Sequence, residues 1–159
     1  MPNTENVISD SASYPADGEI EACIYSECDL TINGTGILLV NGYYKDAIRS
    51  KDIVKILDGI YTIKCKRTGI RGNDGVLISG GNLKISSEKY GIKTTNSGPE
   101  GRGNLIVSGG ELTVIAGQYA FVVTQADLLI YNCTVFDRSV VDTYNVGGTS
   151  NIQEGCMQS

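Results

Sequence analysis

The chain has 159 residues, a formal net charge of −5 and no histidine. This acidic balance argues against nucleic acid and against an anionic membrane surface as partners, because both bind through a basic protein surface. No apolar run reaches the roughly 18 residues of a membrane-spanning helix, and the polar start of the chain lacks the apolar stretch of an export signal.

Residues 1–20 are polar and carry no repeat, which predicts a flexible leader or a partial cap. After them, near-identical phrases recur: DAIRSKDIVKI, TGIRGNDGVLI and YGIKTTNS followed by NLIV. The leading isoleucines Ile48, Ile70 and Ile92 are evenly spaced along the chain. Self-similarity at a fixed period indicates that each copy is one unit, which buries its apolar face only by stacking on its neighbours.

Each repeat continues with a tight turn and a further strand. Gly59, Gly81 and Gly110 each follow an apolar anchor by three positions, and Cys133 takes the same place in the last repeat. Glycine supplies the positive φ that a tight turn demands. Period-two alternation then resumes, which predicts a strand with one buried face and places Tyr61 in the core.

Three short strands per repeat and no helical periodicity predict an all-β parallel β-solenoid. We expect about 22 residues per coil and about five coils over residues 21–136. A doubly wound α/β fold would need helical segments between its strands, and a β-sandwich would not repeat its turns in register. The fourth repeat carries an insertion around NSGPEGRG, which predicts a loop.

The ends of the predicted solenoid lack clear caps. Residues 137–159 lose the repeat and are turn-rich, so we expect an irregular tail or a partial cap there. An open coil end exposes unpaired strand edges, which favours edge-to-edge pairing. Self-association through the coil ends, as a homo-oligomer, is therefore one prediction for this chain.

Stacking at this period turns sequence intervals into columns on the surface. Arg49, Arg71 and Lys93 follow the three isoleucines directly, so we expect a basic column with steps of about 4.8 Å. Like charges at this spacing repel by about 1 kcal/mol per step in water, and something must offset this. Three positions further on lies a second column of polar side chains: Asp52, Asp74 and Asn96.

These two columns allow three interpretations. Arg49 could pair with Asp52 and Arg71 with Asp74, giving a self-neutralising lattice of weak surface ion pairs. The basic column could instead face the carboxylates of an acidic polysaccharide, which suit the planar fork of arginine. The third interpretation treats the acidic column, together with Asp46, as oxygen ligands of calcium. With no histidine and no CxxC pair, a structural zinc site is not expected.

Tyrosines form another candidate surface. Tyr90 and Tyr119 occupy equivalent positions if the insertion of the fourth repeat loops out. An exposed tyrosine ladder would stack on the apolar faces of sugar rings, whereas the alternative is two tyrosines half-buried at strand ends. We predict that Tyr90 and Tyr119 bind the ligand together with the basic column.

The segments YPADGEIEACIYSECDLTING, KDAIRSKDIVKI, GIRGNDGVLISGGNLKI and GIKTTN resemble the clostridial carbohydrate-binding domain family, first met in a cellulose- and pectin-binding surface protein. The resemblance covers roughly residues 14–136, without some N-terminal coils of the family. It implies a right-handed parallel β-helix related to pectate lyases, which binds polysaccharide without cleaving it and carries calcium. Where the family has an acidic residue before Gly-Ile, this chain keeps Asp46 and has Thr68, Tyr90 and Tyr119 at the matching positions.

The predicted function is a noncatalytic module that binds plant cell-wall glycans, acidic and pectin-like or cellulose, outside the cell or at its surface. No catalytic residue is assigned, because catalytic groups usually break a repeat and no such break is visible. Two alternatives stay open. One is a polysaccharide lyase in which Arg71 serves as the base, and the other is a structural, self-associating surface repeat.

Overall fold

The computed structural model describes residues 4–14, 20–96 and 102–158, and within them all regular structure is β. The strands form three parallel sheets, which we call sheets A, B and C. No helix in the described residues is long and apolar enough to cross a membrane. The predicted β-solenoid is confirmed, with about six turns at a spacing of 22–23 residues where we had expected about five.

Sheet A contains seven strands, in the spatial order β1 (Glu5–Ser9), β4 (Ile37–Gly42), β7 (Ile60–Cys65), β10 (Asn82–Ser87), β13 (Glu111–Ala116), β16 (Thr134–Asp137) and β19 (Met157–Gln158). Sheet B contains β2 (Ala22–Ser26), β5 (Asp46–Ser50), β8 (Thr68–Gly72), β11 (Tyr90–Thr94), β14 (Tyr119–Val123) and β17 (Asp142–Val146). Sheet C contains β3 (Leu30–Ile32), β6 (Ile53–Ile56), β9 (Gly75–Ile78), β12 (Asn104–Val107), β15 (Leu128–Ile130) and β18 (Ser150–Ile152).

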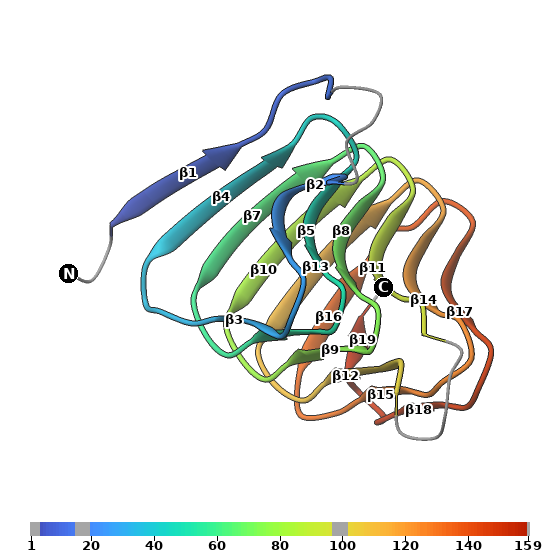
Figure 1. Cartoon of the computed structure of the whole chain (residues 1–159). Helices are drawn as coiled ribbons and strands as arrows, with labels where there is room; N and C mark the ends of the chain where they lie inside the picture. The colour runs from blue at the N-terminus through green and yellow to red at the C-terminus, as the bar shows by residue number, and fades with distance from the viewer. Residues whose placement is uncertain (1–3, 15–19, 97–101, 159) are drawn as a thin grey trace.

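The chain visits the three sheets in turn, so each coil adds one strand to each of them. Figure 1 shows the coils stacked along one axis, with the colour passing from blue to red along the stack. Neighbouring strands within a sheet therefore come from successive repeats, as β5, β8 and β11 do. This winding places residues one repeat apart directly beside each other.

The core is a set of apolar ladders inside the coil. Ile48, Ile70, Ile92 and Phe121 pair in register on successive strands of sheet B and are fully buried. Burying one such side chain contributes about 1.5–3 kcal/mol relative to leaving it exposed. Tyr61 also lies in the core, as predicted, and its hydroxyl donates a hydrogen bond to the carbonyl of Asp58 at 2.5 Å.

The predicted glycine turns lead from sheet C into sheet A. Gly59, Gly81 and Gly110 have φ values of 121°, 89° and 83°, a region that L side chains rarely adopt. A Cβ on Gly81 would also lie 2.7 Å from the carbonyl oxygen of Gly59 in the preceding coil. In the last of these turns the positive φ, 52°, falls on Asn132 rather than on Cys133.

Both ends of the chain contribute strands beyond the predicted range 21–136. Strand β1 pairs with β4 along Glu5–Ser9, so part of the expected leader extends sheet A. Strands β17, β18 and β19 pair with β14, β15 and β16, which differs from the irregular tail predicted for residues 137–159. These terminal strands are mostly exposed, so their sequences lack the apolar alternation that reveals a strand.

Candidate functional site

The basic column predicted from the repeat lies on the outer face of sheet B. Arg49 pairs in register with Arg71, and Arg71 pairs with Lys93. Tyr25 precedes them in the column on β2, whereas Val122 follows on β14. The charged part of the column therefore spans β5, β8 and β11 and ends at both sides with an uncharged residue.

Strand alternation explains why these cations face outward. Each of the three cations stands between two buried residues on its own strand, as Arg49 does between Ile48 and Ser50. The side chains of Arg49 and Arg71 are only 16% and 21% exposed, so most of each side chain is covered by its neighbours. The guanidinium of Arg49 lies 5.9 Å from the ring centre of Tyr25.

A second line of cations borders sheet B at the start of its strands, and the sequence analysis missed it. Lys45, Arg67 and Lys89 recur at the same interval as the three isoleucines. Backbone hydrogen bonds place them on successive coils: Arg67 N donates to Lys45 O at 2.9 Å, and Tyr90 N, next to Lys89, donates to Arg67 O at 2.8 Å. This shared interval was the signal that could have revealed the column.

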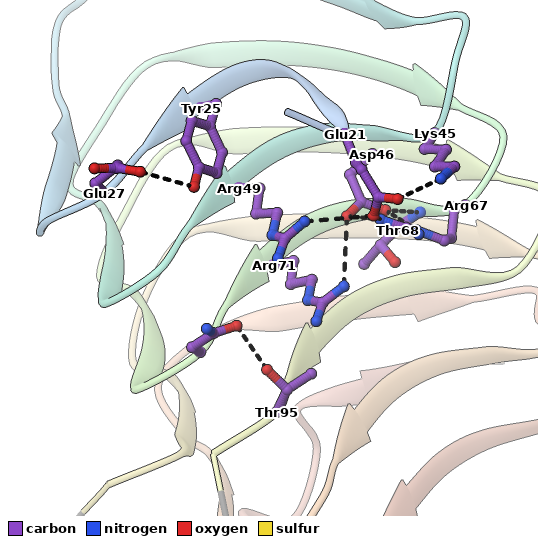
Figure 2. Close-up of polar contacts among 11 residues, drawn as sticks. Glu21, Tyr25, Glu27, Lys45, Asp46, Arg49, Arg67, Thr68, Arg71 and Thr95 are labelled. Atoms are coloured by element: carbon purple, nitrogen blue, oxygen red, sulfur yellow. Dashed lines mark hydrogen bonds and ion pairs between the residues drawn. The ribbon is translucent and has the colours of Figure 1, made fainter. Parts of the chain in front are cut away.

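Two carboxylates lie among these cations, as Figure 2 shows. Glu21 accepts hydrogen bonds from Lys45, from Arg67 at 2.7 Å and from Arg49 at 3.5 Å. The hydrogen bonds from Lys45 and then Arg67 lower the pKa of Glu21 from 4.5 to about 2. At neutral pH Glu21 is therefore ionised and acts as a counterion.

Asp46 is the second carboxylate, and it is fully buried. Arg67 donates two hydrogen bonds to it, from Nε to Oδ1 at 2.7 Å and from Nη2 to Oδ2 at 2.8 Å. The backbone N–H of Thr68 donates to the same Oδ1 at 3.1 Å, and Arg71 Nη1 lies 3.9 Å from Oδ2. The hydrogen bonds to Asp46 raise the pKa of Arg67, so Arg67 stays charged.

The self-neutralising lattice of Arg49 with Asp52 and Arg71 with Asp74 is wrong. Within the described part of the chain, the ion pairs of Arg49 and Arg71 run to Glu21 and Asp46 instead. Strand β5 ends at Ser50, so Asp52 lies in the turn that leads to sheet C, and Asp74 lies in the corresponding turn of the next coil. The turn carries both carboxylates away from the outer face of sheet B.

Two of the predicted calcium ligands have protein partners in the structure. Asp46 is enclosed by cationic and N–H donors. Asp74 accepts a hydrogen bond from Asn96 at 2.5 Å and pairs with Arg102 at 3.2 Å, so a cation already stands at its carboxylate. Across the described residues, no group of three or more His, Cys, Asp or Glu side chains could hold a metal ion. Calcium takes six to eight oxygen ligands, so calcium binding through Asp46, Asp52, Asp74 and Asn96 would need further oxygens and stays a prediction.

Tyr90 and Tyr119 pair in register on β11 and β14, as predicted, and both are half-buried. Thr68 pairs with Tyr90 on the other side, so the three residues form one column between the two lines of cations. The Lys93 Nζ lies 4.7 Å from the ring centre of Tyr90, which joins this column to the basic one. The centre of the inserted loop, residues 97–101, lies outside the described residues.

The face as a whole carries more positive than negative charge. Against the two carboxylates Glu21 and Asp46, the two columns present six cations: Lys45, Arg67, Lys89, Arg49, Arg71 and Lys93. Burial and then Arg49 lower the pKa of Arg71. Burial and then Arg71 lower the pKa of Lys93. In both shifts the neighbouring arginine is the second cause, so like charges lie close together on this face, although the chain carries −5 overall.

The fold and this face define the chain as a parallel β-solenoid with a cationic outer sheet. The family model described as "Carbohydrate-binding domain-containing protein" matches residues 1–154, and the chain belongs to this family. A protein of the same description from Acetivibrio thermocellus is 39% identical over 64 residues, which make up 38% of this chain and 22% of the relative.

A solved structure is also similar over nearly the whole chain. The polysaccharide lyase-like protein from C. thermocellum, in a gadolinium derivative, superposes with a TM-score of 0.93 at 34% identity. The match covers 96% of this chain and 63% of that one. The chain therefore spans less than two thirds of the length of either relative.

Proposed function

We propose that this chain is a noncatalytic polysaccharide-binding module that holds plant cell-wall glycans on the outer face of sheet B. The observation that carries the proposal is the column of Arg49, Arg71 and Lys93, stacked in register beside Tyr90 and Tyr119. One coil advances by about 4.8 Å, a step comparable to one sugar residue of an extended chain. A glycan running along the solenoid axis would meet similar side chains at each coil.

The charge of the face favours an acidic, pectin-like glycan over cellulose. Uronate carboxylates pair well with arginine, whose planar fork matches their two oxygens. Tyr90 and Tyr119 offer rings to the apolar faces of the sugars, which acidic and neutral glycans share. Such polymers lie outside cells, so we place the module outside the cell or at its surface.

The carboxylates on this face favour binding over hydrolysis. A glycoside hydrolase needs one carboxyl group that carries a proton and a second one opposite to it. Glu21, with a pKa of about 2, has no proton to donate at neutral pH. Asp46 is buried and held by Arg67 on both oxygens, so it does not reach a substrate.

A lyase is the second candidate, and a specific observation favours it. Arg71 has a lowered pKa, caused by burial and by Arg49, and a less basic arginine is a better proton acceptor. The similar solved protein is itself described as polysaccharide lyase-like. In this chain Arg71 would have to take a proton from a uronate bound next to it on sheet B.

Affinity electrophoresis in gels with polygalacturonate or soluble cellulose, run beside an absorbance assay for unsaturated sugar products, separates the candidates. A noncatalytic module is retarded in the gel and produces no absorbance, with or without added calcium. Growth of absorbance would instead establish a lyase, and its loss in Arg71→Lys would assign the base. If neither gel retards the protein, a structural, self-associating role replaces binding, and sedimentation at increasing concentration tests it.

A further inference from the structure

The environment of Asp46 defines how this face holds a carboxylate. Its neighbours come from the following coil: the side chains of Arg67 and Arg71 and the backbone N–H of Thr68. Arg67 directly precedes strand β8 and Arg71 lies on it. A carboxylate from one coil therefore lies between two cations of the next coil. Figure 2 shows the arginine ends converging on this point.

The same arrangement of cations repeats one coil later, where the carboxylate is missing. Strands β5 and β8 pair at Ile48 and Ile70, so Thr68 takes the place of Asp46. Lys89 and Lys93 then take the places of Arg67 and Arg71, because each lies one repeat further along the chain. A threonine thus stands where the pattern of cations is built for an acidic group.

Positive charge is left over at this second position. Among the described residues no carboxylate pairs with Lys93, and its ammonium lies against the ring of Tyr90. The Nε atoms of Arg49 and Arg71 are both buried without a hydrogen-bond partner in the described part of the chain, so this feature does not distinguish the two positions. The charge of Lys93 does distinguish them, and an incoming carboxylate would compensate it.

We propose that the position over Thr68, flanked by Lys89 and Lys93, binds one carboxylate of an acidic glycan, in the place that Asp46 fills one coil earlier. This inference rests on the proposed function and deepens it. Thr68 is buried under its neighbours, so the carboxylate meets the ends of Lys89 and Lys93 and not the threonine itself. Tyr90 and Tyr119 follow Thr68 in its own column, so they would lie under the following sugars of the glycan.

Thr68→Asp tests the inference, because it supplies an internal carboxylate at the proposed position. Thr68→Asn is the matched control, with the same shape and no charge. We expect Thr68→Asp to bind polygalacturonate at least tenfold more weakly than the wild type, whereas Thr68→Asn stays within about threefold. A tenfold loss corresponds to about 1.4 kcal/mol. Both variants should bind soluble cellulose as the wild type does.

A second readout covers the case in which Thr68→Asp does not fold well. Lys93→Met keeps the stem of the side chain and deletes the charge, and it should weaken polygalacturonate binding at least threefold and more strongly than it weakens cellulose binding. Wild-type affinity for polygalacturonate in a folded Thr68→Asp or in Lys93→Met would overturn the inference. A wild-type protein that binds cellulose alone would overturn it too and leave the proposed function intact, whereas binding of neither polymer would remove the proposed function itself.

Discussion

Replacing Arg67 with methionine tests the charge network that shapes the face. Asp46 is 0% exposed, and Arg67 supplies two of its close hydrogen bonds, at 2.7 and 2.8 Å. Removing one partner of a buried ion pair costs about 3–5 kcal/mol, because the other charge stays buried without compensation. Arg71 at 3.9 Å and the N–H of Thr68 remain near Asp46, so we expect a smaller loss, about 2–3 kcal/mol.

Urea unfolding followed by circular dichroism measures this loss, and thermal melting should show a fall of about 4–12 °C for a chain of this size. The double variant Arg67→Met with Asp46→Asn should be more stable than the sum of the two single losses, since it removes the unpaired charge. Lys84→Met, an exposed residue on the outer face of sheet A, is the control and should melt like the wild type. An Arg67→Met protein as stable as the wild type would refute the network.

Three further predictions concern the same face. The pKa of Glu21 is lowered from 4.5 to about 2, so its ion pairs stabilise the fold above pH 4.5 and are lost as the pH falls toward 2. The difference in melting temperature between the wild type and Glu21→Gln should therefore disappear over this pH range. A difference that stays constant would contradict this prediction. Arg71→Ala should weaken polygalacturonate binding more than cellulose binding, and added salt should reduce this difference in affinity loss. Equal weakening of both polymers would show that the charge of the basic column does not contribute to binding. Tyr90→Ala and Tyr119→Ala should each weaken both polymers several-fold by calorimetry, and a loss confined to polygalacturonate would argue against stacking on the rings.

The repeat made the solenoid predictable from the sequence. Ile48, Ile70 and Ile92 recur at one interval and are all buried on sheet B. The residues that follow them, Arg49, Arg71 and Lys93, could therefore be predicted to stack in register. The terminal strands could not be predicted in this way. They lie at the open ends and are mostly exposed, so selection for apolar alternation is absent there.

The partners of the cations were not predictable in the same way. Asp52 and Asp74 are near Arg49 and Arg71 in sequence, but the chain turns after each strand and carries them to another side of the coil. Glu21 lies one coil before Lys45, but the interval between them is 24 residues, so counting at the later spacing of 22 residues does not place it in their column. Ion pairs between coils depend on where side-chain ends meet, which strand register alone does not determine.

Titration of the labelled protein with a short oligogalacturonate, followed by amide chemical shifts in NMR, tests the central claim most directly. Binding along the cation and tyrosine columns predicts that the largest shifts fall on β5, β8, β11 and β14 of sheet B, centred on Thr68–Gly72 and Tyr90–Thr94. Shifts gathered on the outer faces of sheets A and C, or at the two open ends of the coil, would contradict the account.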